Sequence, residues 1–287
     1  MNDMSRYINP YTDFGFKKLF GEEGSKDLLI DFLNAVLPAP TRVADLTFRP
    51  SEQLPDNIVD RKAIYDIACI SPTGDIFTVE MQKASQTYFR NRALFYAAFP
   101  IQKQAQKGNW DFKLNPVFLV AILDFEYDQE QERRELRRLV TLKDQNGEVF
   151  VDTLQMVFLQ MPMFNKTEAE LVTQQDKWLY FLKNLESFGE IPAILNEPIF
   201  DHAFEIAEWI KYPSAIQEAY RNSQKAYWDN TNTWNFAMET AEAKGRAEGK
   251  TEEKTEIARN MKKDGVTSET IAKYTGLSPE EIFVRYF

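Results

Sequence analysis

The longest apolar stretch of the chain is PVFLVAILDF, residues 116–125. A strand with one solvated face alternates apolar and polar residues, whereas a continuous apolar run is typical of a strand buried on both faces. The stretch is far too short to cross a bilayer, which takes about 20 apolar residues in a helix. We therefore expect a buried strand in a globular protein, and the rest of the chain must cover both of its faces.

Residues 12–38, TDFGFKKLFGEEGSKDLLIDFLNAVLP, predict two helices. Asp13 is placed to cap the first helix and Gly21 to end it, while Ser25 can cap the second and Pro38 can stop it. Apolar residues of the second helix recur at helical spacing and predict its buried face: Leu28, Leu29, Phe32, Leu33 and Val36.

Other segments fill in the expected order of elements. We expect an edge strand and loop in 41–53, and a helix over about 85–107 with a possible interruption at Pro100. Up to three strands fit 134–162, where QNGE is a turn signal. From 166 to about 243 the pattern is helical and rich in Trp, Phe and Leu.

The composition limits the cellular compartment in which the protein is expected and the ways in which it can bind nucleic acid. The 287 residues hold one Cys and carry a formal net charge of −10. A single Cys forms no disulfide within the chain and fits a reducing compartment, and the first residues lack the apolar run of a secretory signal. We expect a soluble, cytoplasmic protein. The acidic balance argues against coating nucleic acid with the whole surface, but it allows a local basic groove.

Several catalytic classes depend on residues that are scarce here. Zinc sites built from Cys and His ligands need more of both than one chain supplies. A Ser-His-Asp or Cys-His arrangement would have to use His202, the single histidine. His202 lies in EPIFDHAFEIAEWI, which has the pattern of an amphipathic helix, and we interpret it as structural. Carboxylate chemistry, with or without a hard metal such as magnesium, remains.

Two carboxylates occupy unusual places in YDIACISPTGDIFTVEMQKA, residues 65–84. The segment reads as two strands around a turn. If SPTGD is a five-residue loop, Ile70 pairs with Ile76, and the same register places Asp66 opposite Glu80 on one face. Like charges directly opposite each other destabilise a hairpin, and burial raises the cost unless a proton or a cation neutralises them.

A divalent metal is one answer to this repulsion. Magnesium accepts oxygen ligands from two acids and keeps water in its other positions, and phosphodiester hydrolysis is the chemistry that uses such a site. The alternative is that both acids lie on solvated outward faces. A one-residue slip in the assumed register would also separate the faces of Asp66 and Glu80.

Several pieces of the chain, in this order, resemble the Rpn group of recombination-promoting nucleases, which are PD-(D/E)XK nuclease-family transposases. The pieces are DFGFKKLFG (13–21), LLIDFLNAVL (28–37), YDIAC with IFTVEMQ (65–82), YFRNRALFYAA (88–98), MPMFNKTEAEL with DKWLYFLKNL (161–185) and the charged segment that leads to IAKYTGLSPEEI (271–282).

The resemblance implies an α/β (α+β) fold of the restriction-endonuclease type, a central mixed sheet flanked by helices, with a helical C-terminal extension. It implies a metal-dependent DNA endonuclease of low sequence specificity, linked to recombination, mobile elements or defence, with Mg²⁺ or Mn²⁺ as cofactor and DNA as partner. Asp66 and Glu80 would be the catalytic acids and metal ligands. Gln82 would stand where the wider superfamily has Lys, a replacement usual in this family.

Replacement of Lys by Gln82 removes a positive charge and leaves a neutral hydrogen-bond donor beside the acids. Weak or conditional turnover follows from this. Lys83 is adjacent, but alternation points it to the other face. The alternative function is therefore a nucleic-acid-binding or protein-interaction module on a nuclease scaffold, with little or no turnover.

Other candidate residues have a plain structural interpretation as well. Asp13 can be a further metal ligand or a helix cap, and Lys17, one turn later, can face a phosphate or solvent. Lys83, Arg90 and Arg92 can form a basic rim that binds the DNA backbone or a solvated face. The aromatic residues Tyr96, Trp178 and Phe181 are expected to pack.

The predicted organisation is a nuclease-like core over 1–165, a helical extension over 166–240, a charged tether over 241–256 and a small helical unit over 257–287. The tether is a solvated helix or a flexible linker. Gly265 and Gly276 are expected helix stops in the last unit, and residues 278–281 form a capping box.

The last unit, 257–287, resembles a helix-turn-helix, but its five basic residues against four acidic ones do not favour reading of a DNA groove. Its apolar side chains present more apolar surface than a unit of this size can bury by itself. We expect a homo-oligomer, most simply a dimer, held in part by this unit. The residues expected to be exposed are Leu277, Ile282, Phe283, Tyr286 and Phe287.

Overall fold

The computed structural model describes residues 5–50, 52–53, 63–64, 66–83, 88–106, 108–127, 134–278 and 281–282. The chain divides into two compact units, Met1–Trp228 and Asp229–Phe287. The division differs in position from the predicted boundaries after residues 165, 240 and 256, which remain predictions.

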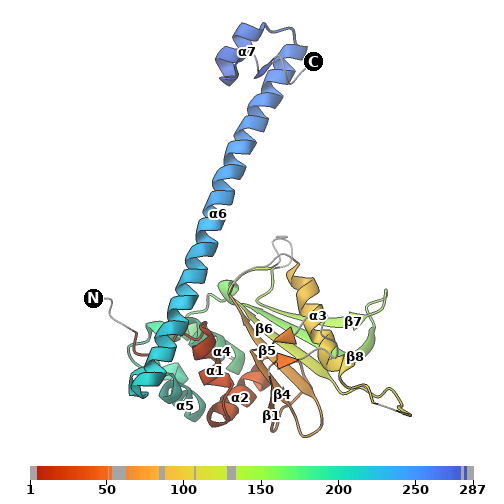
Figure 1. Cartoon of the computed structure of the whole chain (residues 1–287), viewed down its shortest axis with the longest axis vertical. Helices are drawn as coiled ribbons and strands as arrows, with labels where there is room; N and C mark the ends of the chain where they lie inside the picture. Colours follow the sequence, from red (N-terminus) through yellow and green to blue (C-terminus); the bar gives the residue numbers. More distant parts are fainter. Residues whose placement is uncertain are drawn as a thin grey trace. The chain divides into compact units, whose positions relative to one another are not determined.

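A mixed six-stranded sheet forms the centre of the first unit, within the part of the chain that the structure describes (Figure 1). The strand order is β1-β4-β5-β6-β8-β7. The middle strands β5, β6 and β8 are parallel, and the outer pairings β1–β4, β4–β5 and β7–β8 are antiparallel. The bounds are Thr47–Arg49 (β1), Ile67–Ile70 (β4), Ile76–Gln82 (β5), Val117–Leu123 (β6), Arg137–Lys143 (β7) and Val149–Gln160 (β8); Glu52–Gln53 (β2) and Ala63–Ile64 (β3) pair separately.

All seven residues of β6 are buried, so the expectation of a strand buried on both faces is confirmed. Alternate residues of this strand enter two different hydrophobic clusters. Phe118, Val120 and Ile122 join the larger cluster, whereas Val117 and Leu119 face the cluster that contains Ala93 and Ala97 of α3 (Phe89–Gln102). One face of the sheet is thus covered by α3.

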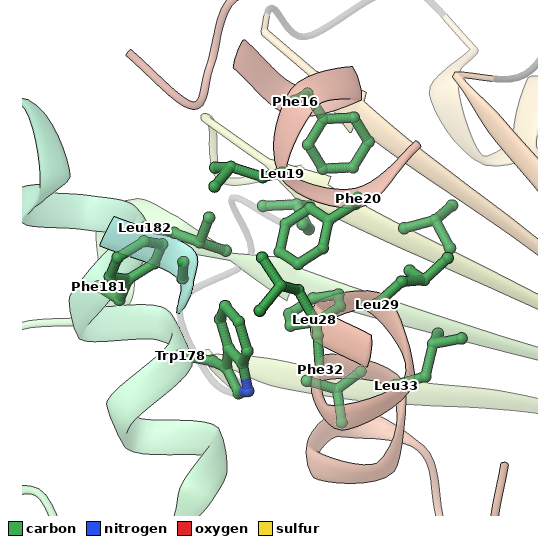
Figure 2. Packing of buried hydrophobic residues seen from close by; sticks show 14 of the residues in the cluster. Phe16, Leu19, Phe20, Leu28, Leu29, Phe32, Leu33, Trp178, Phe181 and Leu182 are labelled. Carbon is green, nitrogen blue, oxygen red and sulfur yellow. The ribbon is translucent and has the colours of Figure 1, made fainter. Parts of the chain in front are cut away.

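Four helices cover the opposite face (Figure 1): α1 (Asp13–Phe20), α2 (Lys26–Val36), α4 (Gln174–Asn184) and α5 (Pro198–Ala207). The predicted apolar face of α2 is buried in full. Figure 2 shows the aromatic centre of this cluster, where the Trp178 ring lies 5.6 Å from Phe20 and 6.0 Å from Phe32 between ring centroids. The packing roles predicted for Trp178 and Phe181 are confirmed, since both are fully buried.

Short 3₁₀ segments connect these helices and strands, at 23–25, 161–163, 168–170, 185–187, 193–195 and 209–211. At the start of α1 the capping residue is Thr12 and not Asp13: the Thr12 hydroxyl accepts from the Gly15 amide at 3.0 Å. The prediction for Asp13 as the cap was wrong by one residue. Gly21 does end α1, while Ser25 takes the cap position of α2 without a side-chain bond.

Helix α6 (Ser214–Lys263) runs through the segment 241–256, whose residues are nearly all exposed. After it, α7 (Ser268–Thr275) begins at Thr267 and ends at Gly276, which has a positive φ of 68°. Gly265 also has a positive φ, so both predicted helix stops are confirmed. The Ser278 hydroxyl accepts from the Glu281 amide at 3.1 Å, as in the predicted capping box.

The second unit has a small core of its own, made of Ala258, Ile271, Leu277 and Ile282. Leu277 and Ile282 are therefore buried, and the expectation that they are exposed was wrong. The reason is that α7 turns back on the end of α6 and covers them within the unit. Phe283, Tyr286 and Phe287 lie outside the described residues. Among the helices described, none combines the length and the apolar character needed to cross a bilayer.

Candidate active site

The hairpin of β4 and β5 has the register that the sequence predicted. Ile70 pairs with Ile76 and Ala68 with Thr78, across a loop of five residues. Asp66 lies one residue before β4, so the same register places it opposite Glu80 of β5. The loop is held by side-chain bonds: the Asp75 carboxylate accepts from the hydroxyls of Ser71 (3.0 Å) and Thr73 (2.6 Å). A locked loop fixes the register, and the register brings the two acids together.

Asp66 is tied to the neighbouring strand by its side chain. Its Oδ2 accepts from the backbone amide of Met81 at 2.7 Å. Burial raises the pKa of Asp66, this hydrogen bond opposes the rise, and the charge of Asp13 adds to it. Lys17 and Lys83 favour the ionised form of Asp66. The second carboxylate oxygen is thus presented from a fixed position.

Glu80 is the more buried of the two acids, with 6% of its surface exposed. Its Oε2 accepts from the Gln82 side-chain amide at 3.0 Å, while its buried Oε1 has no hydrogen-bond partner among the described residues. Burial raises the pKa of Glu80 to about 7, and the charge of Asp66 contributes to the rise. The Gln82 bond and the charge of Arg92 act in the opposite direction. A carboxylate held here is costly unless a proton or a cation accompanies it.

These residues fit a hard divalent cation. Two carboxylates face one another, and Glu80 offers an unpaired oxygen, which is the type of ligand that magnesium prefers. Within the described ranges, no group of three or more acid, His or Cys side chains is close enough to hold a metal ion together. Asp66 and Glu80 would therefore hold an ion as a pair, with water as the remaining ligands.

Asp13 stands apart from that pair. It forms an exposed ion pair with Lys17 at 2.8 Å, one helical turn along α1. Its charge still acts on the pKa of Asp66 and on that of Lys83. The structure thus brings Asp13 and Lys17 near the acids without adding Asp13 to a three-acid cluster.

The basic candidates lie around the acids and rest on aromatic rings. The Lys83 amine lies 5.3 Å from the centroid of Tyr227, and the charges of Asp13 and Asp66 oppose the lowering of its pKa by burial. The exposed Arg92 lies over Tyr96, and Arg90, also exposed, lies over Tyr127. Tyr96 packs beside Ala68, which confirms its expected packing role.

An acid at the end of β6 was not singled out by the sequence. Asp124 follows β6, and its amide donates to the Gln82 carbonyl at 2.9 Å, so the acid sits beside the end of β5. Burial raises the pKa of Asp124 to about 6, and Lys183 opposes the rise. Burial raises the pKa of the half-buried Tyr11, and the charge of Asp124 adds to this rise. The signal was present in LDF: an acid that directly follows a fully apolar strand lies at the strand's carboxyl end.

His202 lies in α5, where its Nδ1 is 2.8 Å from Asp27 Oδ2 of α2. The contact ties two helices of the core together. It agrees with the interpretation of this histidine as structural.

Two models of known protein families match the sequence of this chain. Residues 10–237 match the model described as PD-(D/E)XK nuclease family transposase, and residues 251–282 match the model described as Rpn/YhgA-like nuclease family, C-terminal HTH domain. No curated protein and no solved structure matches the chain. The first match spans well over half of the chain and includes the hairpin with Asp66, Glu80 and Gln82. The chain belongs to the PD-(D/E)XK nuclease family transposases.

Proposed function

We propose that this protein is a metal-dependent DNA endonuclease of low sequence specificity. The observation that carries the proposal is the buried Glu80 opposite Asp66, with one carboxylate oxygen that no described residue hydrogen-bonds. The family match and the mixed sheet are consistent with a hydrolytic nuclease. The C-terminal match to an HTH domain supports DNA as the substrate.

Each site residue has a definite task in this proposal. Asp66 and Glu80 would hold Mg²⁺ or Mn²⁺, and the ion would polarise the phosphate and acidify a bound water. Asp66 keeps one oxygen on the Met81 amide, which fixes the orientation of the other. The pKa of Glu80 is about 7 in the absence of metal, so binding of the ion near neutral pH would displace a proton from this carboxyl.

Gln82 orients Glu80, but its side chain is neutral and adds no positive charge to the site. Its amide donates to Glu80 Oε2, so the amide is engaged with the acid itself. A lysine at this place would stabilise developing negative charge on the phosphate. We therefore expect slow turnover. Lys17, Lys83 and Arg92 are cations whose charges act on the two acids.

DNA contact is proposed for Lys17, Lys83, Arg90 and Arg92. These cations lie on α1, after β5 and on α3, around the hairpin with the acid pair. Phosphate contacts position a duplex without reading its sequence. They fit low specificity and explain how a chain of net charge −10 can bind DNA at one place.

A second candidate function rests on the same pKa. Because the pKa of Glu80 is raised to about 7, a proton can relieve the repulsion between the acids without any metal. With the neutral Gln82 beside it, the hairpin would then be a structural remnant in a DNA-binding module. This candidate predicts DNA binding in EDTA and no cleavage with any metal.

Plasmid cleavage distinguishes the two candidates. Supercoiled plasmid is incubated with the purified protein and Mg²⁺ or Mn²⁺, and with variants Asp66→Asn and Asp152→Asn. Asparagine keeps an acceptor for the Met81 amide, and Asp152 is an exposed acid of β8 that serves as a charge-matched control. We expect nicking by the wild type and the control, and at least a hundredfold loss in Asp66→Asn. Equal nicking by all three would remove this site from consideration.

The biological setting is proposed from the family match together with the sequence. We infer a cytoplasmic protein that acts in recombination, in the movement of mobile elements or in defence, and that forms dimers through the C-terminal unit.

A further inference from the structure

A cavity of about 310 Å³ lies between α3 and the sheet. Its floor consists of Ala68 and Ile70 of β4 and Ile76 and Thr78 of β5. Pro100, near the end of α3, forms a wall. The volume is at the lower end of the range for small-molecule sites, roughly 300–1,000 Å³, which suits a single nucleotide better than a longer ligand.

Two cations line this cavity. Arg49 comes from the edge strand β1, and Lys103 is the C-cap residue of α3. Both residues are exposed, and none of the described residues that line the cavity is acidic. An apolar floor beside two positive charges is suited to a flat ring that carries a phosphate.

Gln104 is held in place at the same rim. Its Nε2 donates to the Asn115 carbonyl at 3.1 Å, and its Oε1 accepts from the Asn115 amide at 2.6 Å. This pair of bonds ties the end of α3 to the segment that enters β6. The wall of the cavity is therefore fixed by hydrogen bonds and does not depend on a ligand.

The cavity lies on the same sheet face as the acid pair. Ala68 follows Asp66 by two residues and Thr78 precedes Glu80 by two, so alternation places all four side chains on one face. The separation along the strands is roughly 7 Å, or two residues at about 3.3 Å each. A ligand in the cavity is thus a direct neighbour of a phosphate held at the acids.

We propose that this cavity binds one nucleotide of the DNA strand next to the phosphate at the acid pair, with the base over the apolar floor and the phosphate at Arg49 and Lys103. The inference rests on the proposed function and adds a substrate subsite to it. A base in an apolar pocket gives stacking and burial without sequence reading, which agrees with low specificity.

Binding of a fluorescent single-stranded 12-mer tests the inference, measured by anisotropy in EDTA so that no cleavage occurs. The double variant Arg49→Ala/Lys103→Ala should bind at least tenfold more weakly. The slope of its log binding constant against log salt concentration should be less steep, by the amount expected for the loss of about two phosphate contacts. Ile70→Phe fills the floor without a change of charge, and it should weaken binding while the salt dependence stays the same. Lys143→Ala removes one positive charge from the edge strand β7, outside the cavity lining, and its affinity should stay within twofold of the wild type. Thermal unfolding confirms that each variant is folded.

The outcomes separate the subsite from the proposed function. If the wild type binds the 12-mer and the double variant behaves like Lys143→Ala, the nucleotide subsite is wrong and the nuclease proposal stands. If the 12-mer does not bind at all, DNA binding fails, and deoxythymidine monophosphate then tests the cavity alone. Binding of this mononucleotide that depends on Arg49 and Lys103 would support a nucleotide site, and its absence would overturn it.

Discussion

At the scale of single residues, the chemistry concentrates on Glu80. The side chain is buried between a neighbouring acid and an amide, and one of its oxygens has no hydrogen-bond partner within the described part of the chain. Such a group is stable only when something neutralises it. A proton and a divalent cation compete to neutralise Glu80. The effects of pH and of metal on protein stability therefore report on the site without any substrate.

The pH dependence of stability is the first prediction. The pKa of Glu80 rises from 4.5 in the unfolded chain to about 7 in the fold. Below about pH 4.5 the group is protonated in both states and causes no penalty. Above about pH 7 it is ionised in both, and the folded state carries the full cost, of the order of 3 kcal/mol. Stability is thus lost as pH rises between these values.

Glu80→Gln should remove this penalty. In EDTA at about pH 8 the variant should unfold at higher urea than the wild type, and the difference should shrink at about pH 5. Denaturant unfolding at both pH values measures it. A wild type more stable than the variant at pH 8 would mean that Glu80 is paired with a cation and is structural.

Gln82 gives a second prediction at this scale. Its amide lies 3.0 Å from Glu80 Oε2, so Gln82→Lys places a positive charge beside the acid. The pKa of Glu80 should fall, and the loss of stability between about pH 5 and pH 8 should become smaller. Gln82→Met is the control, because it removes the hydrogen bond without adding charge, and the pKa of Glu80 should then rise. An NMR titration of the Glu80 carboxyl measures both; a pKa that stays unchanged in Gln82→Lys contradicts the geometry.

At the scale of elements, the hairpin shows what the sequence can predict. Three features were sufficient for the register and for a strand buried on both faces: the loop length, the alternation of side chains between the two faces of a strand, and the apolar run of β6. These features are local, and each has one dominant physical cause. The pairing of Asp66 with Glu80 followed from them.

Other features needed the folded structure. Thr12 and Asp13 are both good caps, and only the bond to Gly15 distinguishes them. Leu277 and Ile282 were expected on the surface because the sequence does not show that α7 packs back onto α6, which is a tertiary contact. The raised pKa of Asp124 and the cavity between α3 and the sheet depend on packing between distant segments.

The cap of α1 is an element-scale prediction. Thr12 is fully buried; its hydroxyl accepts from the Gly15 amide and donates to the Asn9 carbonyl. Thr12→Ala should lower the free energy of unfolding by about 1–2 kcal/mol. Asp13→Ala loses only an exposed ion pair and should cost at most about 0.5 kcal/mol. Urea unfolding compares the two, and a larger loss in Asp13→Ala would reverse their roles.

At the scale of the whole molecule, the question is whether the second unit, residues 229–287, holds two copies of the chain together. Among its described residues, the second unit buries Ala258, Ile271, Leu277 and Ile282 in its own core and leaves Tyr274 72% exposed. We predict a dimer in which residues after 257 contribute to the interface. Light scattering on the full chain and on a chain stopped after Ala243 measures the masses. Identical monomeric masses for both would end this idea.

The binding of a divalent ion to the acid pair is the claim on which the function depends. A ligand that binds only the folded state stabilises it by RT ln(1 + [L]/Kd), about 2.7 kcal/mol at a hundredfold excess over Kd. The most direct measurement is the shift in melting temperature on adding Mg²⁺ or Mn²⁺ to the wild type, to Glu80→Gln and to Asp152→Asn. We predict a rise in the wild type and in Asp152→Asn, and none in Glu80→Gln. A rise of the same size in all three proteins would place the ion elsewhere and contradict the assignment of Asp66 and Glu80 as its ligands.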